Sequence, residues 1–129
     1  MMNAQLETNK QLVREFYNLA FNQQQPEEAA RRYVGPSYRQ HNPQAGDGAE
    51  AFIQFVTGFL AHVPQLSVDI KRTIAEGDFV VTHCLLKMSP EDRGTAVMDI
   101  FRLEDGKIVE HWDVLQPVPE TAANDNTMF

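Results

Sequence analysis

The chain of 129 residues is poor in cysteine and has no long apolar run. Its single cysteine, Cys84, leaves no partner for an intrachain disulfide and no cysteine pair for a zinc site. We therefore expect a reducing, cytoplasmic location. No apolar run approaches the ~20 residues that a membrane-spanning helix needs. Residues 1–7 lack the basic start and apolar stretch of a signal peptide, so no membrane partner is expected.

The chain is also poor in positive charge. Eleven Lys and Arg against 18 Asp and Glu give a net charge of −7 at pH 7. Because an acidic surface repels phosphate backbones, nucleic acid is not an expected partner. The sequence has no glycine-rich phosphate loop and no nucleophile elbow. Hydrophobic residues make up 43% of the chain, as in ordinary globular proteins, and the length suits one domain over residues 1–129, with 118–129 as a polar, extended tail.

Apolar residues recur at helical spacing in the first half of the chain. Pro26 suits the first turn of a helix, where its missing N–H costs little. Asp47 is the expected cap of the third helix, with Glu50 three residues later, and Pro64 ends that helix. The expected helices cover residues 9–21 (from residue 3 at the earliest), 26–34 and 48–63, and residues 37–43 form an extended or turn segment.

The second half alternates between apolar and polar residues, which predicts four antiparallel strands in two hairpins. In the first hairpin, Ile70 is expected to pair with His83 and Val68 with Leu85. This register would place His83 on the apolar face. Three helices followed by four antiparallel strands indicate an α+β fold, with the helices on one face of a curved sheet.

The second hairpin, residues 96–115, carries titratable side chains where a core strand would carry apolar ones. Gly106 suits a three-residue turn with a bulge, which pairs Asp99 with His111 and Val97 with Asp113. A two-residue turn would instead pair Asp99 with Trp112 and move His111 and Asp113 to the opposite face. In both registers His111 and Asp113 share a face, because strand side chains alternate. Such groups on an apolar face are costly unless they are paired or used.

The order of elements and several motifs resemble the SnoaL-like polyketide cyclase family of the nuclear-transport-factor-2-like superfamily. The similarity extends over roughly Leu12 to Pro119. It is carried by Tyr38-Arg39-Gln40-His41-Asn42-Pro43, Gly48-Ala49-Glu50-Ala51-Phe52, Gly77-Asp78-Phe79-Val80-Val81-Thr82-His83, Asp99-Ile100-Phe101-Arg102 and Gly106-Lys107-Ile108-Val109-Glu110-His111-Trp112-Asp113.

This resemblance implies a cone-shaped α+β barrel with an apolar pocket, usually as a homodimer. It implies aldol-type chemistry that uses a pocket aspartate and neither metal nor cofactor. Asp113 matches the acid/base aspartate of the cyclases. Asp99 resembles a second carboxylate of the superfamily's epoxide hydrolases. Those enzymes carry an arginine two residues earlier, where this chain has Val97, which weakens that interpretation.

Each candidate residue has a functional and a structural interpretation. Asp113 is either a general base or a strand-end aspartate bonded to a loop amide or to Arg102. His111 either orients Asp113 or is a buried histidine satisfied by Asp99. The expected catalytic residues are therefore Asp113, His111 and Asp99.

Further residues are candidates for contact with a substrate. Polar side chains that could bond a substrate oxygen are His41, Asn42 and His83, which could equally serve a turn or the core. Apolar wall candidates are Phe16, Phe55, Phe59 and Phe101. A metal site from His111 and Asp113 with His83 or His41 is conceivable by ligand type but is not expected.

The leading expectation is a cofactor-free cyclase, lyase or isomerase that acts on a small apolar carbonyl compound. Asp113 would remove a proton next to the carbonyl, and the pocket would hold both reacting groups together. The alternative is a non-catalytic module of the same fold that binds a small molecule or dimerises. An apolar outer sheet face with Met98, Ile100, Trp112 and Val114 predicts the homodimer.

Overall fold

The computed structural model describes residues 2–129 and has an α+β fold, as predicted. Three helices precede and flank the first strand, and the other four strands follow. The elements are α1 (Met2–Tyr17), a π-helical turn η1 (Asn18–Asn22), α2 (Pro26–Tyr33), β1 (Val34–Gln40), α3 (Ala49–His62), β2 (Ser67–Glu76), β3 (Phe79–Lys87), β4 (Thr95–Glu104) and β5 (Lys107–Pro117). No helix among the described residues is long and apolar enough to cross a membrane.

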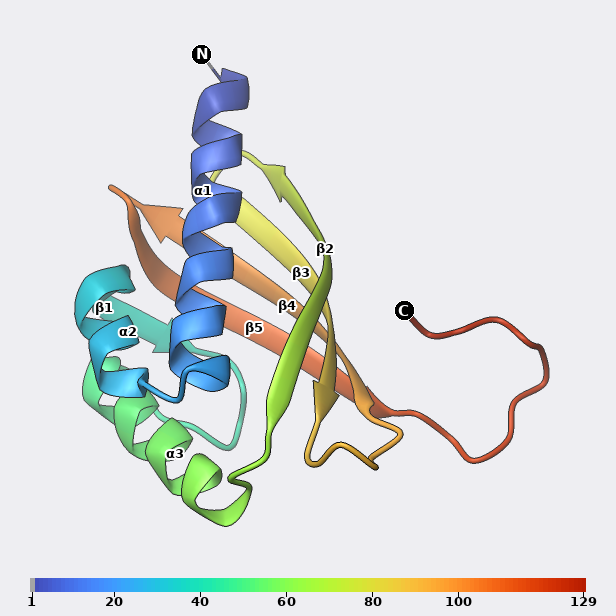
Figure 1. Ribbon diagram of the computed structural model, residues 1–129. Helices are drawn as coiled ribbons and strands as arrows, with labels where there is room; N and C mark the ends of the chain where they lie inside the picture. The colour runs from blue at the N-terminus through green and yellow to red at the C-terminus, as the bar shows by residue number, and fades with distance from the viewer. Residues whose placement is uncertain (1) are drawn as a thin grey trace.

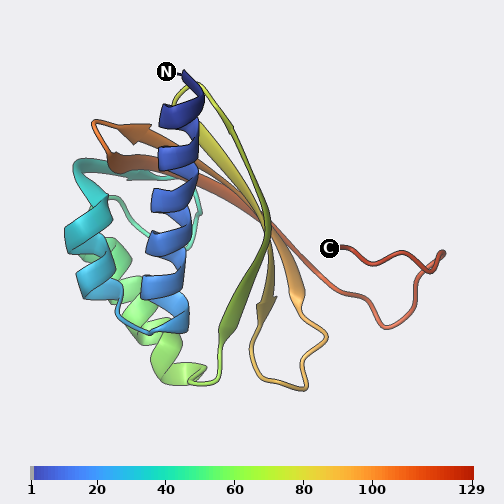
Figure 2. The same cartoon turned by 45° about the horizontal axis from the view of Figure 1, so that its top comes forward.

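The strands form one sheet in the order β1-β5-β4-β3-β2. Strands β2 to β5 are antiparallel, whereas β1 runs parallel to β5. The sheet is strongly curved and stays open, and the three helices lie on its concave side (Figures 1 and 2). The tail, residues 118–129, leaves the end of β5 as irregular chain on the other side of the sheet (Figure 2).

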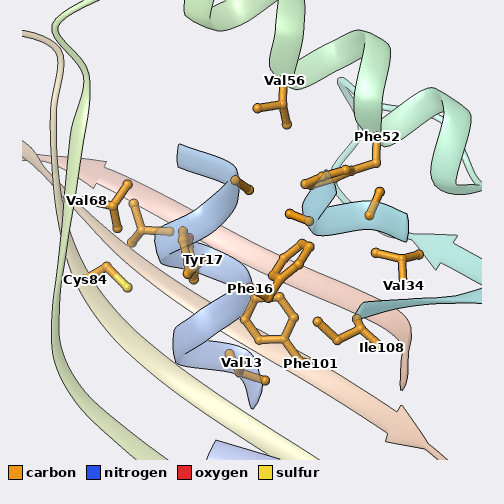
Figure 3. Packing of buried hydrophobic residues seen from close by; sticks show 14 of the residues in the cluster. Val13, Phe16, Tyr17, Val34, Phe52, Val56, Val68, Cys84, Phe101 and Ile108 are labelled. Atoms are coloured by element: carbon orange, nitrogen blue, oxygen red, sulfur yellow. The ribbon is translucent and has the colours of Figure 1, made fainter. Parts of the chain in front are cut away.

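The hydrophobic core fills the space between the helices and the concave face of the sheet (Figure 3). Phe16 of α1 lies at its centre, with ring centroids 5.3 Å from Phe52 of α3 and 6.1 Å from Phe101 of β4. Val13 and Ile108 are fully buried beside them. The apolar stripes predicted for the helices thus face the sheet, because only that side removes them from water.

Two helix boundaries differ from the prediction. Helix α1 already begins at Met2, and its last expected residues form the π-helical turn η1. Asp47 does not cap α3, whose N-cap residue is Gly48 at φ 92° with no side-chain cap. The Asp47 carboxylate instead accepts a hydrogen bond of 2.8 Å from the backbone N–H of Gln40. Asp47 therefore ties the loop before α3 to the end of β1.

The predicted register of the first hairpin is wrong. Glu76 pairs with Phe79 across a two-residue turn, and a bulge between Ile70 and Arg72 reverses the alternation along β2. A one-residue slip moves every side chain to the opposite face. His83 therefore pairs with Arg72 and lies on the outer face, while its neighbours Thr82 and Cys84 are fully buried on the concave face.

The second hairpin also adopts neither predicted register. Asp105 and Gly106 both have positive φ and form a two-residue turn, and a bulge follows between Arg102 and Leu103. Asp99 consequently pairs with Asp113 rather than with His111 or Trp112. This register is two residues away from the one predicted with a three-residue turn. A shift of two preserves the face, so the three titratable side chains still meet.

Candidate active site

A cavity of about 80 Å³ lies between the concave face of the sheet, α1, α3 and the loop before α3. Most of its lining is apolar and aromatic, and its polar groups gather on one wall. The lining residues are Phe16, Tyr17, Phe21, Gln40, Asn42, Ala45, Phe52, Phe55, Val56, Asp99, Phe101, His111 and Asp113. An apolar cavity with a few convergent polar groups is the usual form of a small-molecule site. A larger groove of about 740 Å³ beside α1 is lined mainly by charged and polar side chains.

Asp99 of β4 is the most deeply buried polar group of this wall, with 1% of its surface exposed. Its Oδ2 accepts hydrogen bonds from the Tyr17 hydroxyl at 2.8 Å and from the Thr82 hydroxyl at 2.9 Å. Its Oδ1 lies 2.8 Å from Nε2 of His111. Burial, and then the nearby charge of Asp99, raises the pKa of Tyr17 well above its usual value, so Tyr17 remains a donor.

His111 of β5 joins this carboxylate to two other groups. Its Nδ1 lies 2.8 Å from the side-chain oxygen of Gln40, and its Nε2 lies 3.9 Å from Oδ2 of Asp113. The ring also contacts Phe101, with centroids 4.8 Å apart. The imidazole therefore lies between two carboxylates with both nitrogens engaged.

Asp113 is less enclosed than Asp99, and its side chain is 13% exposed. The Asn42 amide donates to both of its oxygens, at 2.9 and 3.2 Å. Burial raises the pKa of Asp113, while the charge of His111 and the Asn42 hydrogen bond oppose that rise. Arg102 does not reach Asp113, because it pairs with Glu110 at 2.9 Å.

The parallel pairing of β1 with β5 brings Gln40 and Asn42 to these residues. Gln40 is the register partner of His111, and the backbone N–H of His41 donates to the carbonyl of His111 at 2.9 Å. Because side chains alternate with period two, residues 40 and 42 face the cavity opposite residues 111 and 113. One short segment therefore supplies a partner to both the imidazole and the carboxylate.

Three residues expected to contact a substrate lie elsewhere. His41 stacks on Trp112 with ring centroids 4.6 Å apart and pairs with Glu110 at 2.7 Å. His83 contacts Arg72 and stacks against Phe129. Phe59 stacks on Phe55 but does not line the cavity. Strand alternation explains the positions of both histidines. His41 lies between Gln40 and Asn42, which face the cavity, and His83 lies between two core residues, so both histidines point to the outer face.

The structure adds Tyr17 and Gln40 to the site. Tyr17 lies four residues after Val13 on the apolar stripe of α1, and this spacing could have identified it. Gln40 gave no such signal, because its position depends on the pairing of β1 with a strand some 70 residues later.

One imidazole and two carboxylates are close enough here to ligate a metal ion, since ligand atoms of Asp99, His111 and Asp113 lie within 4.8 Å of one another. These atoms already have hydrogen-bond partners within the protein: Nε2 of His111 lies 2.8 Å from Asp99, and the Asn42 amide donates to Asp113. The arrangement therefore does not require a cation, and we do not identify these residues as metal ligands. His83 and His41, the third ligands considered from the sequence, are not part of this group and have other partners, Arg72 for His83 and Glu110 for His41.

Comparison with known proteins agrees with this architecture. The sequence model of the SnoaL-like domain matches residues 13–111. TsrD from Streptomyces laurentii is 25% identical with a TM-score of 0.71, over 84% of this chain and 88% of TsrD. AclR from Streptomyces galilaeus, named as a candidate hydroxylase, is 22% identical with a TM-score of 0.72, over 88% and 82%.

IdmH from Streptomyces antibioticus, named as a candidate polyketide cyclase, is 23% identical with a TM-score of 0.69, over 83% of this chain and 91% of IdmH. No curated protein sequence gives a significant match. The family match covers most of the chain, and the three structures share its fold. The chain therefore belongs to the SnoaL-like domain family.

Proposed function

We propose that this protein is a cofactor-free acid/base enzyme that acts on a small apolar carbonyl compound by an aldol-type cyclisation or a related isomerisation. The observation that carries the proposal is the position of Asp113 at the cavity wall. Its partly buried carboxylate faces aromatic side chains, and burial raises its pKa toward the range useful for proton transfer near neutrality. The similarity to IdmH, named as a candidate polyketide cyclase, supports the same reaction class.

In the proposed reaction, the Asp113 carboxylate removes a proton from the carbon next to a substrate carbonyl. The electrons of that C–H bond form an enolate. The enolate carbon then attacks a second carbonyl of the same molecule, and protonated Asp113 returns its proton to the new alkoxide. The protein gains and loses no proton overall. Enclosure brings the two reacting groups together, which is a large part of the rate advantage.

Asn42 is the proposed donor to the enolate oxygen. Its Oδ1 accepts the backbone N–H of Gln44 at 2.8 Å, which fixes Nδ2 on the side of Asp113. An amide nitrogen carries two hydrogens, and both contacts of Nδ2 go to one carboxylate. One N–H can serve both carboxylate oxygens, which leaves the other N–H available to a substrate oxygen beside Asp113. His41 and His83, the other candidates for this role, lie outside the cavity.

The size of the cavity limits the substrate. Its volume of about 80 Å³ is well below the ~300–1,000 Å³ of sites for drug-sized ligands. We propose that the substrate is a short carbonyl compound, or that a longer one places only its reacting end beside Asp113.

A substrate screen with matched variants tests the proposal. β-Keto esters and short diketones would be incubated with the wild type, and aldol or isomerisation products measured. Loss of a general base costs about 10²–10⁴ in rate, so Asp113→Asn is expected to lose turnover by this factor. Asp69→Asn, at an exposed aspartate of β2, is the matched control and is expected to retain wild-type turnover.

The alternative, a non-catalytic binding module, makes the opposite prediction. Compounds that bind in the cavity would then remain unchanged by the wild type and would bind equally to Asp113→Asn. Turnover by Asp113→Asn at the wild-type rate would exclude Asp113 as the base.

We also propose that the protein is a homodimer that associates through the outer sheet face. Met98 and Ile100 of β4 and Val114 of β5 are 40, 39 and 69% exposed on that face. Apolar side chains gathered on one face favour association.

A further inference from the structure

Gln40 is bonded to three groups at the polar wall of the cavity. Its Nε2 donates to the Tyr38 hydroxyl at 2.9 Å. Its Oε1 accepts the backbone N–H of Asn42 at 3.0 Å and lies 2.8 Å from Nδ1 of His111. The side chain thus spans from β1 to β5.

The Asn42 contact settles which way the Gln40 amide points. A backbone N–H can only donate, so the atom that it meets must be the amide oxygen. A carbonyl oxygen can only accept, so Nδ1 of His111 must carry a proton. Nε2 is then the ring nitrogen free to gain or lose a proton, and it lies 2.8 Å from Asp99 and 3.9 Å from Asp113.

We propose that Gln40 is a positioning residue that keeps a proton on Nδ1 of His111 and so directs Nε2 toward both carboxylates. A proton on Nε2 lies between Asp99 and Asp113 and stabilises their ionised forms. His111 is thereby a partner of the carboxylates, and Asp113 remains the base. The assignment of the Nδ1 proton rests on geometry alone, whereas its catalytic consequence rests on the proposed function.

The surroundings of His111 leave few groups that compete for its proton. Tyr17 of α1, Tyr38 of β1 and Cys84 of β3 lie near the two carboxylates. Burial raises the pKa of all three, that of Cys84 to about 12, so each stays neutral near pH 7. The side chains of α3 at the cavity are apolar. Proton exchange at Nε2 therefore involves Asp99 and Asp113.

Nitrogen NMR of ¹⁵N-histidine-labelled protein tests the assignment without any substrate. The chemical shifts and couplings of the ring nitrogens report which one carries the proton. The His111 signals are identified by their loss in His111→Gln. Three variants are compared with the wild type. Gln40→Leu removes the acceptor, Gln40→Glu keeps an acceptor at the same place, and Gln44→Leu makes the same change at an exposed position in the adjoining loop.

The wild type is expected to show a protonated Nδ1 on His111 wherever the ring is neutral. Gln40→Glu and Gln44→Leu are expected to retain it, and Gln40→Leu to shift His111 toward a mixture with the Nε2-protonated form. A bare Nδ1 in the wild type would overturn the proposal, as would an unchanged tautomer in Gln40→Leu. If Gln40→Leu fails to fold, the wild-type and Gln40→Glu spectra still test the proposal, because a bare Nδ1 on His111 in the wild type overturns it and a protonated Nδ1 in both supports it.

Kinetics then test the catalytic consequence separately. With a substrate in hand, Gln40→Leu is expected to lower kcat by up to about 10²-fold with little change in KM, because misplacement of a catalytic group acts on the chemical step. Gln40→Glu is expected to recover part of kcat. A protonated Nδ1 together with an unchanged kcat in Gln40→Leu would confine Gln40 to a structural role. Failure to find any substrate would count against the proposed function but leave the NMR result intact.

Discussion

At the scale of single residues, Asp99 and Asp113 face each other across β4 and β5 in different surroundings. Asp99 is held by Tyr17, Thr82 and His111, whereas Asp113 is held mainly by the Asn42 amide and lines the cavity. Paired carboxylates in unlike environments take different roles. In the proposed mechanism, Asp99 therefore holds the site in place and Asp113 is the reactive carboxylate.

This difference predicts opposite effects on stability at pH 7. Asp99→Asn removes the negative charge that the Tyr17 and Thr82 hydroxyls and a protonated His111 stabilise, which should cost about 1–3 kcal/mol of unfolding free energy. The pKa of Asp113 is raised in the fold, so its stabilising contribution is present at low pH and is lost as pH rises through that pKa. Asp113→Asn removes this penalty and should be as stable as the wild type or more so at pH 7.

Urea unfolding of both variants at pH 7 and at pH 3.5 checks these signs. Any excess in the unfolding free energy of Asp113→Asn over the wild type should shrink at pH 3.5. That pH is near or below the ~3.9 pKa of an unfolded aspartate, so the carboxyl is largely protonated in both states. Marked destabilisation by Asp113→Asn at pH 7 would mean that its carboxylate stabilises the fold rather than serving the site.

The sequence predicted part of this site for a clear physical reason. The register with a three-residue turn predicts Asp99, His111 and Asp113 on one face. The observed register differs from it by two residues, and an even shift keeps side chains on the same face. His83 was misplaced because a bulge in β2 reverses the alternation, and a bulge leaves little signal in a single sequence.

At the scale of elements, the sequence did not reveal the pairing of β1 with β5, although it made Asn42, just after β1, a candidate for contact with a substrate. The sequence predicts extended chain or a turn for residues 37–43, and no local sequence pattern indicates that this segment pairs with a parallel strand. Their pairing with β5 places Gln40 and Asn42 beside His111 and Asp113. The helices and antiparallel strands were predictable because their signals are local, whereas this contact joins segments some 70 residues apart.

Helix α3 supplies Phe55 to the cavity wall, where its ring is 37% exposed. We predict that Phe55→Ala enlarges the cavity and lets longer carbonyl compounds bind. Because the ring is partly exposed, the loss of stability should be less than the ~3–5 kcal/mol of a buried phenylalanine. Binding of a homologous series of ketones, measured by calorimetry, checks this. Phe59→Ala, one turn along and outside the cavity, should leave the preferred length unchanged.

At the scale of the whole molecule, the helices cover the concave face of the sheet and leave its outer face without a helical layer (Figure 2). The outer face also holds the stacked pair His41 and Trp112, next to exposed Phe79 and Ile100. The concave face therefore encloses the candidate site. The outer face has no helical cover, and His83 on it stacks against Phe129 of the tail, so the proposed association uses the part around Met98, Ile100 and Val114.

We predict a homodimer through this face at micromolar concentration, with more than the ~1,000 Å² buried in biological contacts. Ile100→Lys places a charge on this apolar face, where burial against a second copy without a partner is costly, and should yield a monomer. Leu115→Lys, at an exposed residue whose neighbour Val114 points to the opposite face, should remain dimeric. Sedimentation velocity distinguishes these outcomes, and a monomeric wild type would contradict the prediction.

The account depends most on Asp113 as the reactive carboxylate, and carbon NMR of its side-chain carboxyl measures this directly. The ¹³C signal of Asp113, identified by its loss in Asp113→Asn, should titrate with a midpoint above the ~3.9 of an ordinary aspartate. With a substrate in hand, kcat/KM should fall as pH drops through the same midpoint, because protonated Asp113 cannot accept a proton. A midpoint at or below ~3.9 would contradict the assignment of Asp113 as the general base.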